Sequence, residues 1–187
     1  MFKRTLNLLA YKNSFFLFGP RQVGKTYLIK HTLLPDLFID LLKQSEFLRY
    51  IKDVSILSRE VEALKKEKCC VVIDEIQRCP ELLNEVQLIM DNKPEIQFIL
   101  TGSSARKLRR AGINLLGGRA ITLHLHPLTS EELAGSFSLE EALQFGTIPN
   151  IVIEKDRQNK IRLLKSYVEI YIKEEIQQES LTRNIPA

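Results

Sequence analysis

The sequence predicts a three-layer α/β fold, with a five-stranded, mainly parallel sheet and helices on both of its faces. The chain has 187 residues, of which 44% are hydrophobic and 27% charged. This is the composition of one soluble, folded unit. Short apolar runs alternate with segments whose apolar residues recur at helical spacing. Such alternation is typical of parallel sheets, because crossover helices join their strands.

The predicted elements follow in order along the chain. Strands are expected at residues 15–18, 37–39, 69–73, 96–100 and 121–125. Helices are expected at residues 26–34, 46–51, 56–66, 80–90 and 104–111. Composition changes most strongly after Pro149, so we expect a core domain over residues 1–150 and a helical extension over 151–187. Within residues 156–179 the apolar positions form one helical stripe, which needs a second chain or the sheet to cover it.

Charge and cysteine usage exclude several classes of protein. The net charge of +4 is too small to indicate a nucleic-acid partner by itself. No apolar run is long enough to span a membrane, and polar residues interrupt the stretch that follows the basic N-terminus, so we expect a cytoplasmic protein. Cys69, Cys70 and Cys79 lack the spacing of a disulfide framework or a zinc site, and we expect them to be buried and reduced.

A glycine-rich motif joins the first predicted strand to the first predicted helix. Residues 19–26 read Gly-Pro-Arg-Gln-Val-Gly-Lys-Thr, the pattern of a P-loop. Gly19 and Gly24 allow the backbone to turn and to aim its N–H groups at phosphate oxygens, helped by the positive end of the helix dipole. Lys25 reaches the β- and γ-phosphates, and the Thr26 hydroxyl ligates Mg²⁺. The sequence therefore predicts that the chain binds ATP with Mg²⁺.

The residues predicted to bind the nucleotide form one continuous segment. They are Gly19, Pro20, Arg21, Gln22, Val23, Gly24, Lys25, Thr26 and Tyr27.

Two carboxylates end the third predicted strand. Asp74 is placed to hold the Mg²⁺ shell through water, since this hard cation prefers oxygen ligands, so Thr26 and Asp74 are the predicted metal residues. Glu75 is placed to act as the base that polarises the attacking water. The alternative is a pair of solvated turn carboxylates before Pro80.

Hydroxyl groups end the fourth predicted strand. Thr101 or Ser103 is expected to sense the γ-phosphate, because in P-loop ATPases with a glutamate after the metal aspartate such a polar sensor lies on a strand inserted between the loop strand and the acidic strand. The alternative for Ser103 is a cap of the following helix.

Five segments form a recognisable set. They are residues 19–26, Val72-Ile73-Asp74-Glu75-Ile76-Gln77-Arg78, Leu100-Thr101-Gly102-Ser103-Ser104, Gly118-Arg119-Ala120 and Leu125-His126-Pro127-Leu128-Thr129. Together they resemble a prokaryotic family of AAA+-like P-loop ATPases. Its members have an ATPase core, then a small helical, winged-helix-like part and a C-terminal domain of unknown function. The resemblance covers nearly all of the chain, which we expect to be a truncated or split member.

The resemblance also implies a role for Arg119. In AAA+ proteins an arginine near the start of the fifth strand reaches the nucleotide of a neighbouring subunit, and Arg119 matches by position. It would neutralise charge on the transferred phosphoryl group. This role requires a homo-oligomer, formed through Arg119 or the last helix, and the alternative is a local ion pair. The predicted catalytic residues are Lys25, Glu75, Thr101, Ser103 and Arg119.

The function expected from these residues is hydrolysis of ATP to ADP and phosphate. Two alternatives stay open: a nucleotide-dependent switch with little hydrolysis, and a P-loop kinase. A basic cluster is the one feature that favours a nucleic-acid partner, although a solvated helix face is the simpler interpretation. The cluster consists of Arg106, Lys107, Arg109 and Arg110.

Overall fold

A computed structural model describes residues 2–103, 108 and 116–172 of the chain. Its contacts divide the chain into two compact units. The sheet unit consists of Leu6–Gly19 and Lys25–Leu125, and the helical unit consists of the residues up to Thr5, of Pro20–Gly24 and of the residues from His126 onward. The predicted boundary near Asn150 stays a prediction; Asn150 itself lies inside helix α8 (Pro149–Ile153).

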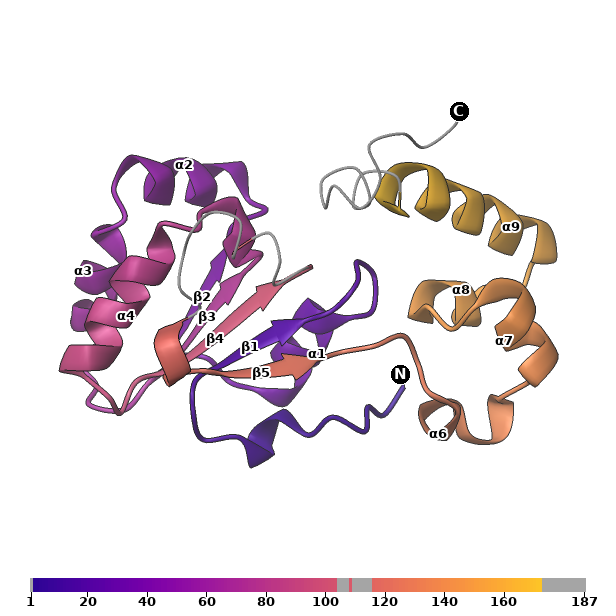
Figure 1. Cartoon of the computed structure of the whole chain (residues 1–187), viewed down its shortest axis with the longest axis horizontal. Helices are drawn as coiled ribbons and strands as arrows, with labels where there is room; N and C mark the ends of the chain where they lie inside the picture. Colours follow the sequence, from indigo (N-terminus) through magenta and orange to yellow (C-terminus); the bar gives the residue numbers. More distant parts are fainter. Residues whose placement is uncertain (1, 104–107, 109–115, 173–187) are drawn as a thin grey trace. The chain divides into compact units, whose positions relative to one another are not determined.

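The sheet unit is built on five parallel strands, as the sequence predicts (Figure 1). The strands are β1 (Phe15–Phe18), β2 (Leu37–Asp40), β3 (Cys70–Asp74), β4 (Gln97–Gly102) and β5 (Ile121–His124). Their order across the sheet is β2-β3-β4-β1-β5. The predicted insertion of one strand between the loop strand and the acidic strand is thereby confirmed, since β4 lies between β1 and β3.

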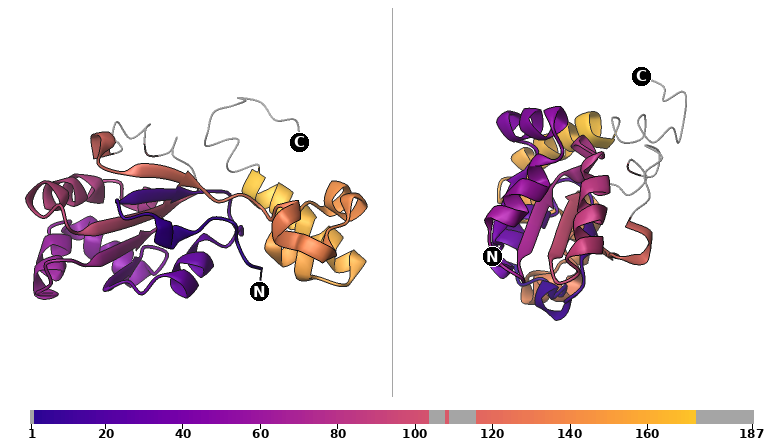
Figure 2. Two further views of the ribbon diagram at one scale, coloured as in Figure 1. Left: turned by 90° about the horizontal axis from the view of Figure 1, so that it is seen from below. Right: turned by 90° about the vertical axis from the view of Figure 1, so that its left-hand side faces the viewer.

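Helices cover both faces of this sheet (Figures 1 and 2). They are α1 (Lys25–Thr32), α2 (Gln44–Lys52), α3 (Ile56–Ala63) and α4 (Leu82–Asn92), with short turns η1 (Leu8–Ala10), η2 (Ile76–Arg78) and η3 (Leu116–Gly118). The connection from β1 to β2 crosses the sheet in the direction opposite to the later connections. Right-handed crossovers therefore place α1 on one face and α2, α3 and α4 on the other.

Alternating side chains of the strands build the two layers of the core. Phe16 and Phe18 of β1 belong to one apolar cluster with Leu57 of α3 and Val86 of α4. Leu17 lies between them in sequence, is fully buried, and points to the opposite face because successive strand residues alternate. The predicted three-layer α/β fold is confirmed.

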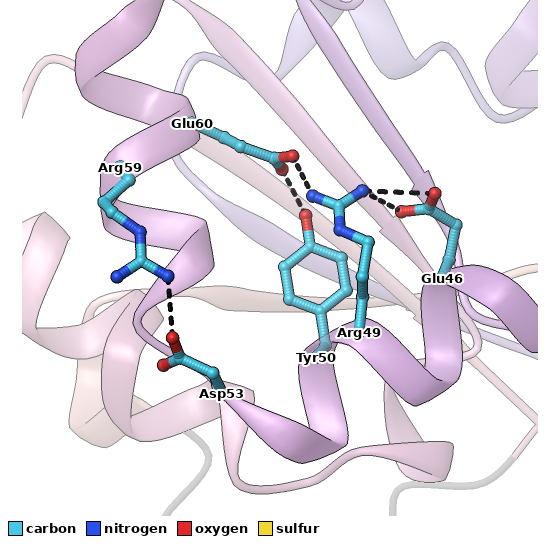
Figure 3. Close-up of polar contacts among 6 residues, drawn as sticks. All are labelled: Glu46, Arg49, Tyr50, Asp53, Arg59 and Glu60. Carbon is cyan, nitrogen blue, oxygen red and sulfur yellow. Dashed lines mark hydrogen bonds and ion pairs between the residues drawn. The ribbon is translucent and has the colours of Figure 1, made fainter.

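A polar network joins α2 to α3 (Figure 3). The Tyr50 ring is fully buried, and its hydroxyl donates a hydrogen bond to Glu60. Burial and this bond raise the pKa of Tyr50, so the phenol stays neutral and keeps donating. Arg49 pairs with Glu46 in the first turn of its own helix and with Glu60 of α3, so charged contacts as well as the Tyr50 hydrogen bond link the two helices. A separate ion pair, between Asp53 at the end of α2 and Arg59 of α3, also joins the two helices (Figure 3).

The helical unit holds several short elements that sequence periodicity did not predict. They are α6 (Ser130–Leu133), η4 (Ala134–Ser136), α7 (Leu139–Phe145) and α8. α9 (Arg157–Ser166) and the π-helical turn η5 (Tyr167–Ile172) follow, inside the range 156–179 for which the sequence predicts a helix. Side-chain caps start three of them: Thr129 caps α6, Ser138 caps α7 and Asp156 caps α9. Each cap satisfies backbone N–H groups that the helix leaves without partners.

Part of the apolar stripe of the last helix is covered inside the helical unit. Ile161 and Leu164 of α9 pack against Phe145, Ile148 and Ile151, the last two at the start of α8 and within it. The expectation that only a second chain or the sheet covers this stripe is therefore wrong for these two residues. Ile176, which belongs to the same predicted stripe, lies outside the described residues.

An ion pair ties the N-terminal segment into the helical unit. The Arg4 guanidinium lies 3.1 Å from a Glu132 carboxylate oxygen, and their side chains are 9% and 2% exposed. Arg4 also donates to the carbonyl groups of Val23, at 3.5 Å, and His126. Burial acts to raise the pKa of Glu132, but hydrogen bonds from Thr5 and the charge of Arg4 help to hold it below its ordinary value.

The cysteines are free thiols, as predicted. Cys69 and Cys79 are buried, and Cys70 is partly buried. Burial raises the pKa of Cys70 and of Cys79 to about 11, which favours the protonated thiol at neutral pH.

Candidate functional site

The phosphate-loop segment has the backbone conformation of a tight, glycine-dependent turn. Gln22 and Gly24 adopt φ angles of 64° and 93°, in the left-handed region. A Cβ atom on Gly24 would meet nothing within 4 Å, so its φ angle, and not the space around it, makes glycine the favoured residue. Gln22 carries a Cβ atom, so the left-handed conformation strains its backbone. Strained residues of this kind are uncommon and cluster at functional sites.

Lys25 is the first residue of α1 and lies in the sheet unit. Its side chain is buried, with 6% of the residue exposed, and its Nζ donates a hydrogen bond of 2.7 Å to the carbonyl oxygen of Gly19. The ammonium group is thus held next to the carboxyl end of β1, close to the first residue of the loop.

Asp74 organises two hydroxyl groups at the carboxyl end of β3. It is 1% exposed, and one carboxylate oxygen accepts a hydrogen bond of 2.7 Å from Thr26 Oγ1. The other oxygen accepts from Thr101 Oγ1 on β4. A buried carboxylate of this kind is costly unless it is hydrogen-bonded or coordinates a cation. The predicted neighbours Thr26 and Asp74 lie together.

The chemistry of these donors fits Mg²⁺. Among the residues that the structure describes, no group of three or more His, Cys, Asp or Glu side chains forms a protein cage for a metal ion. Mg²⁺ does not require one, because it is usually held by one or two carboxylates, a hydroxyl, waters and substrate phosphates. The Thr26 hydroxyl and the Asp74 carboxylate, 2.7 Å apart, supply such oxygen donors.

Glu75 follows Asp74 in a left-handed conformation, with φ of 61° and ψ of 47°. Its backbone N–H donates a hydrogen bond of 3.0 Å to Thr101 Oγ1. Its carboxylate accepts a hydrogen bond from the side-chain amide of Gln77. Thr101 thus holds the backbone of Glu75 in the turn after β3, and Gln77 holds its carboxylate.

The two predicted sensor hydroxyls differ in their bonding. Thr101 is fully buried and uses its hydroxyl twice, as a donor to Asp74 and as an acceptor from the Glu75 N–H. Ser103 is 9% exposed, and its Oγ is buried without a hydrogen-bond partner among the described residues. Of the two, Ser103 is the hydroxyl that the described contacts leave available.

Arg119 and Tyr27 lie apart from this group. Arg119 precedes β5 and pairs with Asp91 at the end of α4, with a 2.6 Å contact. Because β1 and β5 run parallel, the start of β5 lies at the edge of the sheet opposite to the carboxyl end of β1. The ring of Tyr27, which is 49% exposed, stacks on His31 along α1.

A comparison with family models identifies the type of domain. A model described as "AAA domain" matches residues 11–134. The chain belongs to this AAA domain family. A domain of this family is a nucleotide-binding domain of the ATPase type, and the match includes the phosphate loop, both carboxylates of β3 and its turn, and Arg119. No curated protein matches the chain. Among the described residues, no helix is both long enough and apolar enough to cross a membrane.

Two residues that contact this region escaped prediction. Gln77 contacts Glu75, and Arg4 contacts the backbone of Val23 in the loop. The signal for Gln77 is its place two residues after Glu75 in a short turn. Arg4 carries no sequence signal of its own, because its partners lie far along the chain. Of the predicted basic cluster, Arg106, Lys107, Arg109 and Arg110 lie outside the described residues.

Proposed function

We propose that this AAA domain binds ATP with Mg²⁺ at residues 19–26 and hydrolyses it to ADP and phosphate. The observation that carries the proposal is the buried Asp74 carboxylate, which bonds the Thr26 hydroxyl at the start of α1 and the Thr101 hydroxyl on β4. This arrangement links the helix after the phosphate loop to β3 and β4, at whose carboxyl ends the two carboxylates and the two candidate sensor hydroxyls lie.

Each residue then has a defined role. The backbone N–H groups of the loop and the Lys25 ammonium would bind the phosphates and offset the charge that develops on them. Thr26 and Asp74 would hold Mg²⁺, which when bound neutralises phosphate charge. Of the two hydroxyls at the carboxyl end of β4, we assign the γ-phosphate contact to Ser103, which follows the strand, and a positioning role to Thr101, because the Thr101 proton is already donated to Asp74.

Glu75 would orient the attacking water and accept its proton. The water oxygen bonds to the γ-phosphorus, the bond from that phosphorus to the β–γ bridging oxygen breaks, and ADP leaves with the electron pair of that bond. The left-handed turn at Glu75 supports this role, since a strained conformation is retained where its geometry is needed.

The test measures phosphate release from ATP with Mg²⁺, and nucleotide binding in parallel, on the purified chain. We expect the native chain to turn over and Glu75→Gln to bind nucleotide but to lose about 100-fold or more in kcat, as for other general bases. Lys25→Ala should weaken nucleotide binding. Exposed residues supply the matched controls, Glu140→Gln and Lys12→Ala, which should behave as the native chain.

A different pattern would reject hydrolysis. If the native chain and Glu75→Gln both bind ATP tightly and neither releases phosphate, the domain is a nucleotide-dependent switch. If Lys25→Ala binds as well as the native chain, residues 19–26 are not the nucleotide site.

A further inference from the structure

The side chain of Gln77 is held in one orientation by the turn that follows β3. Gln77 lies in η2, and its Nε2 donates a hydrogen bond to a Glu75 carboxylate oxygen. A carboxylate only accepts hydrogen bonds, so the NH₂ end of the amide faces it and the oxygen end points away. The Gln77 side chain therefore presents a donor to Glu75 with a defined direction.

The oxygen end of the same amide is buried but makes no hydrogen bond that would stabilise the fold. Gln77 Oε1 is buried and has no hydrogen-bond partner among the described residues. A buried acceptor without a partner costs free energy, about 1–3 kcal/mol in typical cases. Among the described residues, the hydrogen bond to Glu75 is the side-chain interaction that offsets the cost of burying this glutamine.

Gly102 provides the space that the amide occupies. A Cβ atom built on Gly102 would lie 2.6 Å from Gln77 Oε1 and 3.3 Å from a ring carbon of Phe18. The first distance is impossible for a real contact, and the glutamine, being the flexible partner, would have to move. The last residue of β4 is thus small enough to let Gln77 reach Glu75.

We propose that Gln77 is a positioning residue, which fixes the Glu75 carboxylate in the direction that water activation requires. The inference rests on the proposed function, because it assigns Glu75 the role of the base. It adds that two residues outside the phosphate loop set the rate of the chemical step: Gln77 through its amide, and Gly102 through the absence of a side chain.

Kinetics of Gln77→Met give the first test, since methionine keeps the length and loses the donor. We expect kcat to fall about 10- to 100-fold, the range typical of groups that orient a functional side chain from behind. The Kd for ATP should stay unchanged, because Gln77 is expected to act on Glu75 and not on the phosphates. Gln44→Met, at an exposed position of α2, is the control and should keep the native kcat. An unchanged or increased kcat in Gln77→Met would overturn the proposal.

A double-mutant cycle separates positioning from general damage to the fold. Gly102→Ala should lower kcat in the native chain by displacing the amide. In a Gln77→Ala background the same change should have little further effect, because no amide is left to displace. Equal losses in both backgrounds would mean that Gly102 acts independently of Gln77, against the proposal.

An NMR measurement tests the contact whether or not the chain hydrolyses ATP. The side-chain amide signals of Gln77 are assigned by their loss in Gln77→Met. We expect these signals to shift in Glu75→Ala and not in Glu140→Ala. If they do not respond to Glu75→Ala, the inference fails even in an active enzyme. If they respond in a chain that never releases phosphate, the contact stands and the proposed hydrolysis fails.

Discussion

Two hydroxyl residues at the end of β4 illustrate how position within a few ångströms separates structural from chemical roles. Thr101 is committed to Asp74 and to the Glu75 backbone, whereas Ser103 has no such partner among the described residues. Burying a polar group without a hydrogen bond lowers stability, so retaining Ser103 favours a use that comes with a ligand.

These bonds predict opposite effects of two substitutions. Thr101→Val removes a donor and an acceptor from buried partners and should lower the free energy of unfolding by about 1–3 kcal/mol. Ser103→Ala should leave that free energy unchanged or slightly raised, yet lower kcat by about 100-fold, the loss typical of one donor to the reacting phosphate. Urea unfolding and phosphate release on both variants provide the measurement.

The same experiment separates the sensor role of Ser103 from that of a helix cap. Loss of a cap costs about 1 kcal/mol of stability and leaves the chemistry alone. A destabilised Ser103→Ala with native kcat would therefore assign Ser103 to capping.

At the scale of elements, Arg4 and Glu132 join three segments of the helical unit. Arg4 comes from the N-terminal segment, Glu132 from α6, and the Val23 carbonyl that Arg4 contacts comes from the phosphate loop. The pair is nearly inaccessible to water, so salt and solvent screen it less than the surface ion pairs of α2 and α3.

The lowered pKa of Glu132 makes its contribution to stability depend on pH. Because the folded-state pKa lies below the ordinary value of 4.5, the contribution is fully present above that value and is lost as pH falls through the folded-state pKa. Glu132→Gln should lower the free energy of unfolding by about 1.5–3 kcal/mol at neutral pH, the worth of a hydrogen-bonded charge. The difference should shrink steadily in acid well below pH 4.5.

Denaturant unfolding at several pH values checks this prediction. Glu131→Gln, one residue earlier on the exposed side of α6, should be close to neutral at every pH. A gap between Glu132→Gln and the native chain that stays constant into acid would show that the ionised carboxylate contributes nothing.

At the scale of the whole molecule, Arg119 lies at the edge of the sheet opposite to the end of β1. Its ion pair with Asp91 is partly exposed, with side chains 39% and 45% accessible, and such pairs contribute about 0–1 kcal/mol. A neighbouring subunit would therefore meet an arginine that leaves Asp91 at little cost.

Mixing inactive variants tests whether Arg119 acts in a second subunit. We expect Arg119→Ala and Glu75→Gln each to hydrolyse ATP poorly alone. Mixed, they should regain part of the native rate, because an Arg119 from the Glu75→Gln chain can serve the intact Glu75 of its neighbour. Absence of recovery, together with a specific activity independent of protein concentration, would restrict Arg119 to its contact with Asp91.

Much of the fold could be predicted because its periodicities are strong. Three of the five strands, β1, β3 and β4, are apolar runs in which nearly every residue is buried, and spaced apolar positions mark the helices between the strands. The helices α6, α7 and α8 escaped prediction because each spans at most seven residues, too few for a periodic signal. Side-chain caps define the starts of α6 and α7, and the sequence marks these caps with Thr129 and Ser138, whereas α8 begins at Pro149 without a side-chain cap.

The site was predictable where its chemistry is local in sequence. Residues 19–26, Asp74 and Glu75 each belong to a short motif at a strand end, and the structure brings Thr26 to Asp74. Gln77 and Gly102 lie inside two of the recognisable segments, but the sequence assigns neither of them a role. Their relation depends on the distance between two turns from different strands, and only the packed backbone defines it.

The order of the strands in the sheet affects how the chain folds during its synthesis on the ribosome. β1 is the first strand to leave the ribosome, yet it pairs with β4 and β5. Phe15 therefore has no strand partner until Ile99 and Ile121 have been synthesised. β2 and β3 are synthesised between β1 and β4, and they pair with each other but not with β1. A growing chain thus carries an uncovered Phe-Phe-Leu-Phe segment until more than half of it has been made, the kind of exposure that favours aggregation. We therefore expect β1, an interior strand of the finished sheet, to be a binding site for chaperones during synthesis.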